Sequence, residues 1–307
     1  MRHEVVVSAP AKVNLCLGVG PVRSDGFHPL ATVYQAIGLY DQVTATAAPP
    51  GEWALEVTGH PRLAVADVPT DDRNLALRAA RLLAEHHGLE TAAGLHVHKG
   101  IPVAGGLAGG SADAAASLLA CDLLWDTHTP REDLLALAGR LGSDVPFALT
   151  GGTALGSGRG EVVTPAMARG NFWWVVVESP VGLSTPQVYA EFDRLHQGQQ
   201  VAQPEVPDVL MEALRSGDSA RLGAALSNDL QEPALLLRPE LAEVLECGLT
   251  ASAHGALLSG SGPSCLFLAE GRSHADRVAA ALDEAGFGPL SVAPGPVPGA
   301  RPARALW

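Results

Sequence analysis

The stretch Lys99–Asp113, KGIPVAGGLAGGSAD, decides how this 307-residue chain is interpreted. Because glycine has no Cβ, its backbone adopts positive φ values freely and can turn successive N–H groups toward one point. From Ser111 to Trp125 an alanine- and leucine-rich run predicts a helix. A glycine loop that leads into a helix favours phosphate, since unpaired N–H groups and the helix dipole both attract an anion. The loop glycines are Gly105, Gly106, Gly109 and Gly110.

The alternative is a tight turn in front of a buried helix, but two Gly-Gly pairs exceed what a turn needs. The loop also differs from the common phosphate motifs. A P-loop requires G-x-x-x-x-G-K-[ST], and no lysine lies between Gly105 and Ser111. A dinucleotide fingerprint requires G-x-G-x-x-G, and Leu107 stands where the second glycine is needed. A cation that assists chemistry must therefore come from elsewhere in the chain.

Composition excludes several classes of function. The chain is 47% apolar and 17% charged, and its length suits about two domains. A net charge of −13 argues against a nucleic-acid partner, whose affinity depends on neutralising phosphates. We see no signal peptide and no apolar run near the roughly 20 residues of a membrane span, so we expect no membrane partner and a cytoplasmic location. Four widely spaced cysteines without a C-x-x-C pattern predict reduced core residues: Cys16, Cys121, Cys247 and Cys265.

Lysine is strongly depleted, because 20 basic residues comprise 18 arginines and only Lys12 and Lys99. A solvated surface lysine can usually become arginine, whereas a lysine that acts as a compact point charge cannot. We therefore expect both lysines to be functional. Alternation along 11–19 places Lys12 and Asn14 on one face of a strand, which indicates the lining of a cleft.

Other segments also carry candidate functional residues. Asp144 lies between Gly142 and Pro146 in an apolar stretch, so it either caps a helix or projects over a cleft, and the local sequence does not separate the two. His96 and His98 share one strand face but lack a third ligand, so we predict no metal site there. We expect helices over 74–88, 186–195 and 272–285, a strand over 172–177, and a loose tail over 294–307.

Three separated motifs occur in one order: PAKVNLCL from Pro10, IPVAGGLAGGSADAA from Ile101 and LSGSGPS from Leu258. Together they resemble the GHMP kinase superfamily, which includes galactokinase, homoserine kinase and the mevalonate kinases. Further segments resemble its branch that acts on cytidine-diphosphate-linked methylerythritol: SDGFHPL, LGSDVPF, GRGE and STPQVY. The resemblance implies an α+β fold in two lobes, with a ribosomal-S5-domain-2-like N-terminal domain over 1–168, a ferredoxin-like C-terminal domain over 169–293, and the Pro-rich tail.

The same resemblance implies transfer of the γ-phosphoryl group of ATP to the 2-hydroxyl of the methylerythritol unit, with Mg²⁺ as the metal. Asp144 is then the base that takes the hydroxyl proton, and Lys12 keeps Asp144 ionised and stabilises developing charge. The residues implied to bind ATP are Lys99, Pro102, Val103, Ala104, Gly105, Gly106, Leu107, Ala108, Gly109, Gly110, Ser111 and Ala112.

For the acceptor, the implied contacts are Asn14, Phe27, His28, Thr185 and Tyr189. Phe27 and Tyr189 match an aromatic pair that sandwiches the cytosine, although many relatives carry tyrosine first and phenylalanine second. Two alanines of the loop, Ala104 and Ala108, replace glycines of many relatives and restrict φ there.

Two other functions share most of these features. A sibling kinase for homoserine or mevalonate would share the loops without the cytosine-binding set. An inactive nucleotide-binding regulator would keep the glycine loop and lose Lys12 or Asp144, and both are present. We expect a small-molecule substrate and a monomer or weak homodimer.

Overall fold

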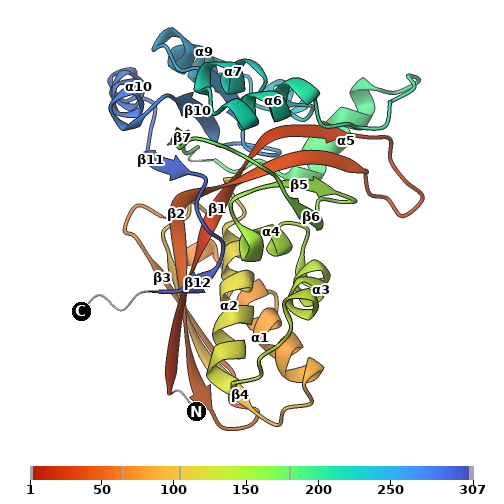
Figure 1. The fold of residues 1–307 in the computed structure, drawn as a ribbon, viewed down its shortest axis with the longest axis vertical. Helices are drawn as coiled ribbons and strands as arrows, with labels where there is room; N and C mark the ends of the chain where they lie inside the picture. Colours follow the sequence, from red (N-terminus) through yellow and green to blue (C-terminus); the bar gives the residue numbers. More distant parts are fainter. Residues whose placement is uncertain (1–2, 64, 104, 180, 304–307) are drawn as a thin grey trace.

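Two lobes stacked along the long axis form the computed structural model (Figure 1), which describes residues 3–63, 65–103, 105–179 and 181–303. The chain is α+β throughout, as predicted. The first lobe contains β1 (Glu4–Val19), β2 (Leu30–Ala48), β3 (Ala54–Gly59), α1 (Leu75–His86), β4 (Ala92–Lys99), α2 (Gly109–Trp125), α3 (Arg131–Leu141), α4 (Val145–Thr150), β5 (Thr153–Ser157) and β6 (Val162–Pro165).

The second lobe is built mainly from the following segments. They are β7 (Phe172–Val177), α5 (Thr185–Leu195), α6 (Asp208–Ser216), α7 (Ser219–Ala224), α8 (Gln231–Leu237), α9 (Glu240–Thr250), β9 (Gly255–Leu258), β10 (Cys265–Ala269), α10 (Arg272–Glu284) and β11 (Leu290–Gly295). Its sheet is antiparallel, in the order β11-β7-β10-β9. The short strands β8 (Ser227–Asn228) and β12 (Arg301–Pro302) both join β1 of the first lobe.

The long hairpin of β1 and β2 positions the site. It belongs to the sheet ordered β12-β1-β2-β4-β3 and extends toward the second lobe, while α1–α4 lie on one side of that sheet (Figure 1). Its register shifts between Pro10 and Ala11 and again between Asn14 and Cys16. Such irregularities bend a strand and re-aim its side chains. The stretch that carries Lys12 and Asn14 lies between these two shifts.

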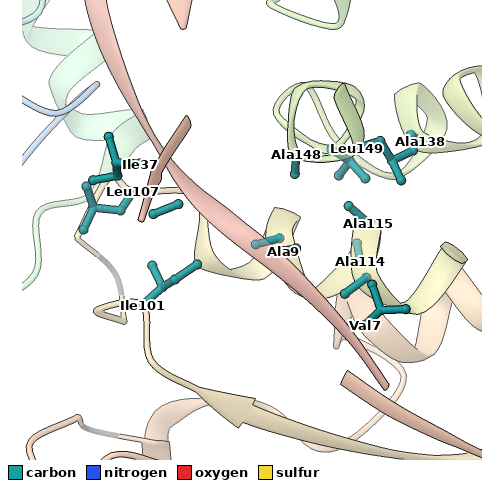
Figure 2. Close-up of a cluster of buried hydrophobic side chains, with 14 of the residues drawn as sticks. Val7, Ala9, Ile37, Ile101, Leu107, Ala114, Ala115, Ala138, Ala148 and Leu149 are labelled. Atoms are coloured by element: carbon teal, nitrogen blue, oxygen red, sulfur yellow. The ribbon is translucent and has the colours of Figure 1, made fainter. Parts of the chain in front are cut away.

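The helix after the glycine loop, α2, is buried on nearly all sides. It begins at Gly109, two residues before the predicted start at Ser111. Its small side chains allow close packing: Ala114 and Ala115 contribute to the same core as Val7 and Ala9 of β1 (Figure 2). The same view groups the buried side chains of Ile37 on β2, Ile101 just before the glycine loop and Leu107 within it.

Most predicted elements are confirmed within two or three residues. The helix predicted from Asn74 is α1, and the Asn74 side chain accepts a hydrogen bond from the N–H of Ala76 at 2.8 Å. The predicted strand over 172–177 is β7. All four cysteines are free thiols, although Cys247 is only partly buried. No helix of the described residues is both long and apolar enough to cross a membrane.

The prediction of a loose tail is wrong for residues 294–303, and residues 304–307 lie outside the described residues. The chain after β11 returns to the first lobe (Figure 1). There the N–H of Ala300 donates to the carbonyl of Ala148 at 2.8 Å, and β12 pairs with β1. The Pro-rich composition misled the prediction, because the segment is held by partners remote in sequence rather than by local structure.

Candidate active site

A cleft of about 910 Å³ lies where the two lobes meet, and its lining comes from both of them. That volume is at the upper end of the range for small-molecule sites. Sixteen of the predicted site residues line it: Lys12, Asn14, Phe27, His28, Lys99, Pro102, Val103, Gly105, Gly106, Leu107, Ala108, Gly109, Gly110, Asp144, Thr185 and Tyr189. Two predicted residues of α2, Ser111 and Ala112, are not part of this lining as described, and Ala104 lies outside the described residues.

The structure brings Lys12 and Asp144 together from positions far apart in the chain. The Nζ atom of Lys12 lies 3.8 Å from Oδ2 of Asp144. The lysine side chain is 8% exposed and the aspartate side chain is 29% exposed, so the carboxylate is the more accessible partner. At 3.8 Å the two charges attract without a short hydrogen bond, which leaves the carboxylate able to accept a proton from a third group.

Asp144 occupies the N-cap position of α4, yet its side chain makes no capping hydrogen bond. The capping alternative therefore does not account for this carboxylate. Burial is the largest cause that raises the pKa of Tyr34 well above its ordinary value, followed by the charge of Asp144 and hydrogen bonding with it. Tyr34 thus keeps its proton beside Asp144.

A directed chain of hydrogen bonds orients Lys12. Its Nζ donates to Oδ1 of Asn14 at 2.8 Å, and Nδ2 of Asn14 donates to the hydroxyl of Thr32 at 2.8 Å. Thr32 in turn donates to the carbonyl of Cys16 at 2.6 Å. The last acceptor is a backbone carbonyl, which cannot donate, so the direction of every bond in the chain follows. Sequence alternation identified Lys12 and Asn14 but not Thr32.

The glycine loop is supported from both lobes. The N–H of Lys12 donates to the carbonyl of Leu107 at 3.2 Å, and the hydroxyl of Ser259 donates to the carbonyl of Gly106 at 3.0 Å. Gly106 has a φ of +74°, and a Cβ at this position would collide with the Ser259 carbonyl. Glycine is therefore required there by both conformation and close approach.

The N-terminus of α2 faces this loop. Its N-cap residue, Ala108, makes no side-chain capping hydrogen bond and has a φ of +60°. Among the described residues no side chain caps the first N–H groups of α2, and the dipole of this 17-residue helix adds to their attraction for an anion.

Lys99 lies at the end of β4, where both of its carboxylate partners are buried, unlike the partner of Lys12. Its ammonium donates to Asp41 and, at 2.6 Å, to Oδ2 of Asp113. Burial acts to lower the pKa of Lys99, but the charges of Asp113 and Asp41 outweigh it and raise that pKa. Burial, followed by the charge of Asp41, raises the pKa of Asp113 well above its ordinary value. The sequence predicted a functional Lys99 and gave no sign of either carboxylate partner.

Most of the residues predicted to contact the acceptor lie on the loop between β1 and β2 and on α5. The rings of His28 and Tyr189 lie 5.1 Å apart, and the Nδ1–H of His28 donates to the carbonyl of Gly20 at 2.8 Å. Burial, then the charge of Asp144, raises the pKa of Tyr189 to about 12. Thr185 shares a 2.8 Å hydrogen bond with Ser261 of the β9–β10 turn.

Phe27 is half exposed, whereas Asn14 and His28, two other residues predicted to contact the acceptor, are buried. The guanidinium of Arg159 lies 4.8 Å from the centre of its ring, a cation–π distance. Arg159 also lines the cleft. The sequence placed it in the GRGE motif but assigned it no role, because nothing local links it to Phe27.

Family models of GHMP kinases match both lobes. The model of the GHMP kinase N-terminal domain covers residues 74–152, and that of the C-terminal domain covers residues 210–287. Together they match just over half of the chain, so the chain belongs to the GHMP kinase family.

The curated relatives narrow this class. A 4-diphosphocytidyl-2-C-methyl-D-erythritol kinase from a Nocardioides species is 57% identical over 293 residues, covering 95% of this chain and 97% of the relative. The kinase of the same name from Thermobifida fusca is 56% identical over 301 residues, covering 97% of each chain.

Solved structures agree with this assignment. A crystal structure of 4-(cytidine 5'-diphospho)-2C-methyl-D-erythritol kinase has a TM-score of 0.77 at 34% identity, covering 96% of this chain and 99% of the other. A homoserine kinase from Cytophaga hutchinsonii has a TM-score of 0.76 at 20% identity, covering 99% of this chain and 98% of the other. At that identity the second match supports the fold alone.

Proposed function

We propose that this chain transfers the γ-phosphoryl group of ATP to the 2-hydroxyl of 4-diphosphocytidyl-2-C-methyl-D-erythritol, a step of non-mevalonate isoprenoid precursor synthesis. The observation that carries the proposal is the pairing of Lys12 with Asp144 at 3.8 Å in the cleft lined by the glycine loop. Phosphoryl transfer depends on positioning and charge neutralisation more than on covalent catalysis. This cleft offers both.

In the proposed reaction Asp144 takes the proton of the acceptor hydroxyl. The hydroxyl oxygen forms its bond to the γ-phosphorus as the bond from that phosphorus to the oxygen of the departing ADP breaks. Lys12, fixed by Asn14, stabilises the negative charge that develops on the transferred group. The N–H groups of the loop and of the α2 N-terminus hold the phosphates of ATP in place.

Mg²⁺ suits the oxygen donors that face this region. It prefers hard oxygen ligands and usually binds through one or two protein groups together with substrate phosphates. The carboxylate of Asp144, in the cleft lining, is a donor of this kind. The hydroxyl of Ser111 is a second oxygen donor in the first turn of α2, although Ser111 is outside that lining. When bound, the ion would neutralise charge on the phosphate oxygens.

On the acceptor side we assign the cytosine to the space between Phe27 and Tyr189, beside His28. The guanidinium of Arg159 would neutralise the diphosphate of the acceptor, since it is the cation next to Phe27 in the cleft lining. All these residues come from one chain, so a monomer suffices. We further propose that the ATP-binding domain covers 1–168 and its partner domain covers 169–293.

A coupled assay of ADP release tests the function, with 4-diphosphocytidyl-2-C-methyl-D-erythritol, mevalonate and homoserine as separate acceptors. We expect turnover with the cytidylated acceptor only. Turnover with mevalonate or homoserine alone would identify a sibling kinase instead. Tight ATP binding without turnover of any acceptor would favour a nucleotide-binding regulator.

Replacing Tyr189 by alanine tests the acceptor side separately. Stacking contributes about 1–3 kcal/mol per base, so we expect KM for the cytidylated acceptor to rise about 5- to 150-fold while KM for ATP changes little. Steady-state kinetics with each substrate varied in turn measures both constants. An equal rise in the two KM values would contradict the assignment of Tyr189 to the cytosine.

A further inference from the structure

A second group of polar side chains lies at the open end of the β9–β10 hairpin, opposite its glycine turn. His254 immediately precedes β9, Glu270 immediately follows β10, and His274 lies in the first turn of α10. One ligand atom from each of the three lies within 4.8 Å of the others. None of these three described residues lines the cleft.

The hydrogen bonds of His274 leave one ring nitrogen as an acceptor. Its Nε2 lies 3.0 Å from the carbonyl oxygen of Ser252, which can only accept, so Nε2 carries the proton. Nδ1 therefore holds a lone pair. A metal-binding histidine typically donates its other N–H to a backbone carbonyl in this way. The one competing contact described for Nδ1 comes from the N–H of Glu270 and is long, at 3.3 Å.

His254 is oriented in a similar way. Its Nδ1 lies 2.9 Å from the hydroxyl of Ser219, the first residue of α7. With the proton on Nδ1 and donated to that hydroxyl, Nε2 holds the lone pair. The rings of His254 and His274 are 5.0 Å apart and inclined by 66°, so the two imidazoles do not stack face to face.

We propose that His254, Glu270 and His274 bind a divalent transition-metal ion, with zinc as the representative of the class. Two imidazoles and one carboxylate are a known three-ligand set for zinc, with water in the remaining position. Zinc binds such donors at about 2.0–2.2 Å, so the three ligand atoms need to converge by about one ångström. Mg²⁺ does not suit the site, because it prefers oxygen ligands.

Surrounding charges favour a cation. Asp218 is close enough to His254 that the histidine contributes to lowering the pKa of Asp218, after larger effects from the backbone N–H groups of Arg221 and Ala220 and from the charge of Arg221, which lies 3.7 Å from the carboxylate. The neighbouring cation Arg272 pairs with Asp276 at 2.8 Å and lies over the ring of Trp173. The net charge of −13 adds a weak general attraction.

An ion at this position would join the two strand ends of the hairpin to α10. The other end of the same hairpin carries Ser259, whose hydroxyl donates to the carbonyl of Gly106 in the glycine loop. Because an ion bound only by the folded chain stabilises it by mass action, zinc should raise the unfolding temperature as its concentration rises.

Isothermal titration of the untagged full-length protein with zinc chloride, in the presence of excess Mg²⁺, tests the site. We expect one zinc per chain. His254→Asn retains a group that can contact Ser219 and removes Nε2, and Glu270→Gln changes only the charge of an exposed side chain. Each should weaken zinc binding at least tenfold, and Ser219→Ala should weaken it about tenfold.

The matched control is the double variant His96→Asn, His98→Asn. These two histidines also form a pair, and both contact the hydroxyl of Thr58. This variant should bind zinc like the wild type. The proposal is overturned if the wild type binds no zinc, if Glu270→Gln and His254→Asn bind it unchanged, or if the control loses binding equally. Kinase activity is not the readout, so either result is independent of the proposed function.

Discussion

The two lysines of the chain, Lys99 and Lys12, differ in how exposed their carboxylate partners are. Lys99 is enclosed, with a side chain that is 3% exposed and partners, Asp41 and Asp113, that are 0% and 4% exposed. Lys12 is also buried, but its carboxylate partner Asp144 is 29% exposed and stands 3.8 Å away. The first lysine has its charge neutralised inside the protein, whereas the second shares a cleft with an accessible carboxylate.

The enclosed group of Lys99, Asp41 and Asp113 connects the chain on the two sides of the glycine loop. Oδ1 of Asp41 accepts from the N–H groups of Gly100 at 2.7 Å and Ile101 at 2.8 Å, just before the loop. Lys99 links this carboxylate to Asp113 on α2, just after the loop. Asp41, on β2, thereby fixes the separation of the two loop ends.

The difference in exposure and distance suits the two groups to different roles, one to structural support of the loop and the other to chemistry in the cleft. A buried ion pair with short hydrogen bonds on both sides has little capacity left for a substrate, and its disruption leaves an uncompensated charge. A longer pair with one exposed partner contributes less to folding but remains available for proton transfer. The rarity of lysine predicts that both lysines are needed, and their contacts indicate a different reason for each.

The largest effect should come from Asp144→Asn. An amide cannot take the hydroxyl proton, and loss of a general base costs about 10²–10⁴-fold in rate. The thermal stability should change little, since the Asp144 side chain caps no helix N–H. Steady-state turnover, ATP titration calorimetry and thermal unfolding of the same preparation measure the three properties. Loss of ATP binding or a large loss of stability would mean that Asp144 supports structure, as Asp41 does.

The second largest effect should come from Asp41→Asn, and it should be a loss of free energy of unfolding. Removing one carboxylate from a buried charge network costs about 3–5 kcal/mol. We expect a drop of this size in the free energy of unfolding, measured by urea denaturation. A change below about 1 kcal/mol would show that Asp113 alone satisfies Lys99 and that the loop ends need no clamp.

Asp113→Asn should instead change how stability depends on pH. Because the pKa of Asp113 is raised in the folded state, the unfolded chain loses this proton at a lower pH than the folded chain. The stabilisation is therefore full below the unfolded pKa and falls by about 1.4 kcal/mol per pH unit until the folded pKa is reached. Asparagine cannot ionise, so the variant should lose this slope.

Urea denaturation of wild type and Asp113→Asn from mildly acidic to neutral pH gives the two slopes. The amide oxygen can accept from Lys99 as Oδ2 of Asp113 does, so the two proteins should be most alike at the acidic end. Parallel curves across the range would mean that Asp113 is ionised in the folded chain.

The sequence predicted those features that have a local cause. Glycine spacing located the loop, alternation placed Lys12 and Asn14 on one strand face, and capping chemistry located the start of α1 at Asn74. The meeting of Lys12 with Asp144 followed from a family resemblance, because no spacing within the chain implies it.

The remaining features depend on contacts between remote residues. Asp41 is 58 positions from Lys99, and no motif marks it. Thr32 reaches Asn14 across the β1–β2 register rather than along one strand. The tail after β11 is held by pairing with β1 and by Ala148, so its composition alone suggested a looser segment than the one that forms. Such contacts follow from the fold and not from neighbouring residues.

The smallest effect should come from Ala108→Gly, at the point where the loop joins α2. Ala108 has a φ of +60°, which costs an L-residue about 1–2 kcal/mol and costs glycine almost nothing. Glycine also makes the unfolded chain more flexible, so the net gain in the free energy of unfolding should be about 0.5–1 kcal/mol. Ala116→Gly, inside α2, is the matched control and should lose about 1 kcal/mol, because Ala116 lies in the interior of a regular helix. Urea denaturation of both variants measures the contrast, and a loss of stability in both would show that the loop adopts a different backbone at Ala108.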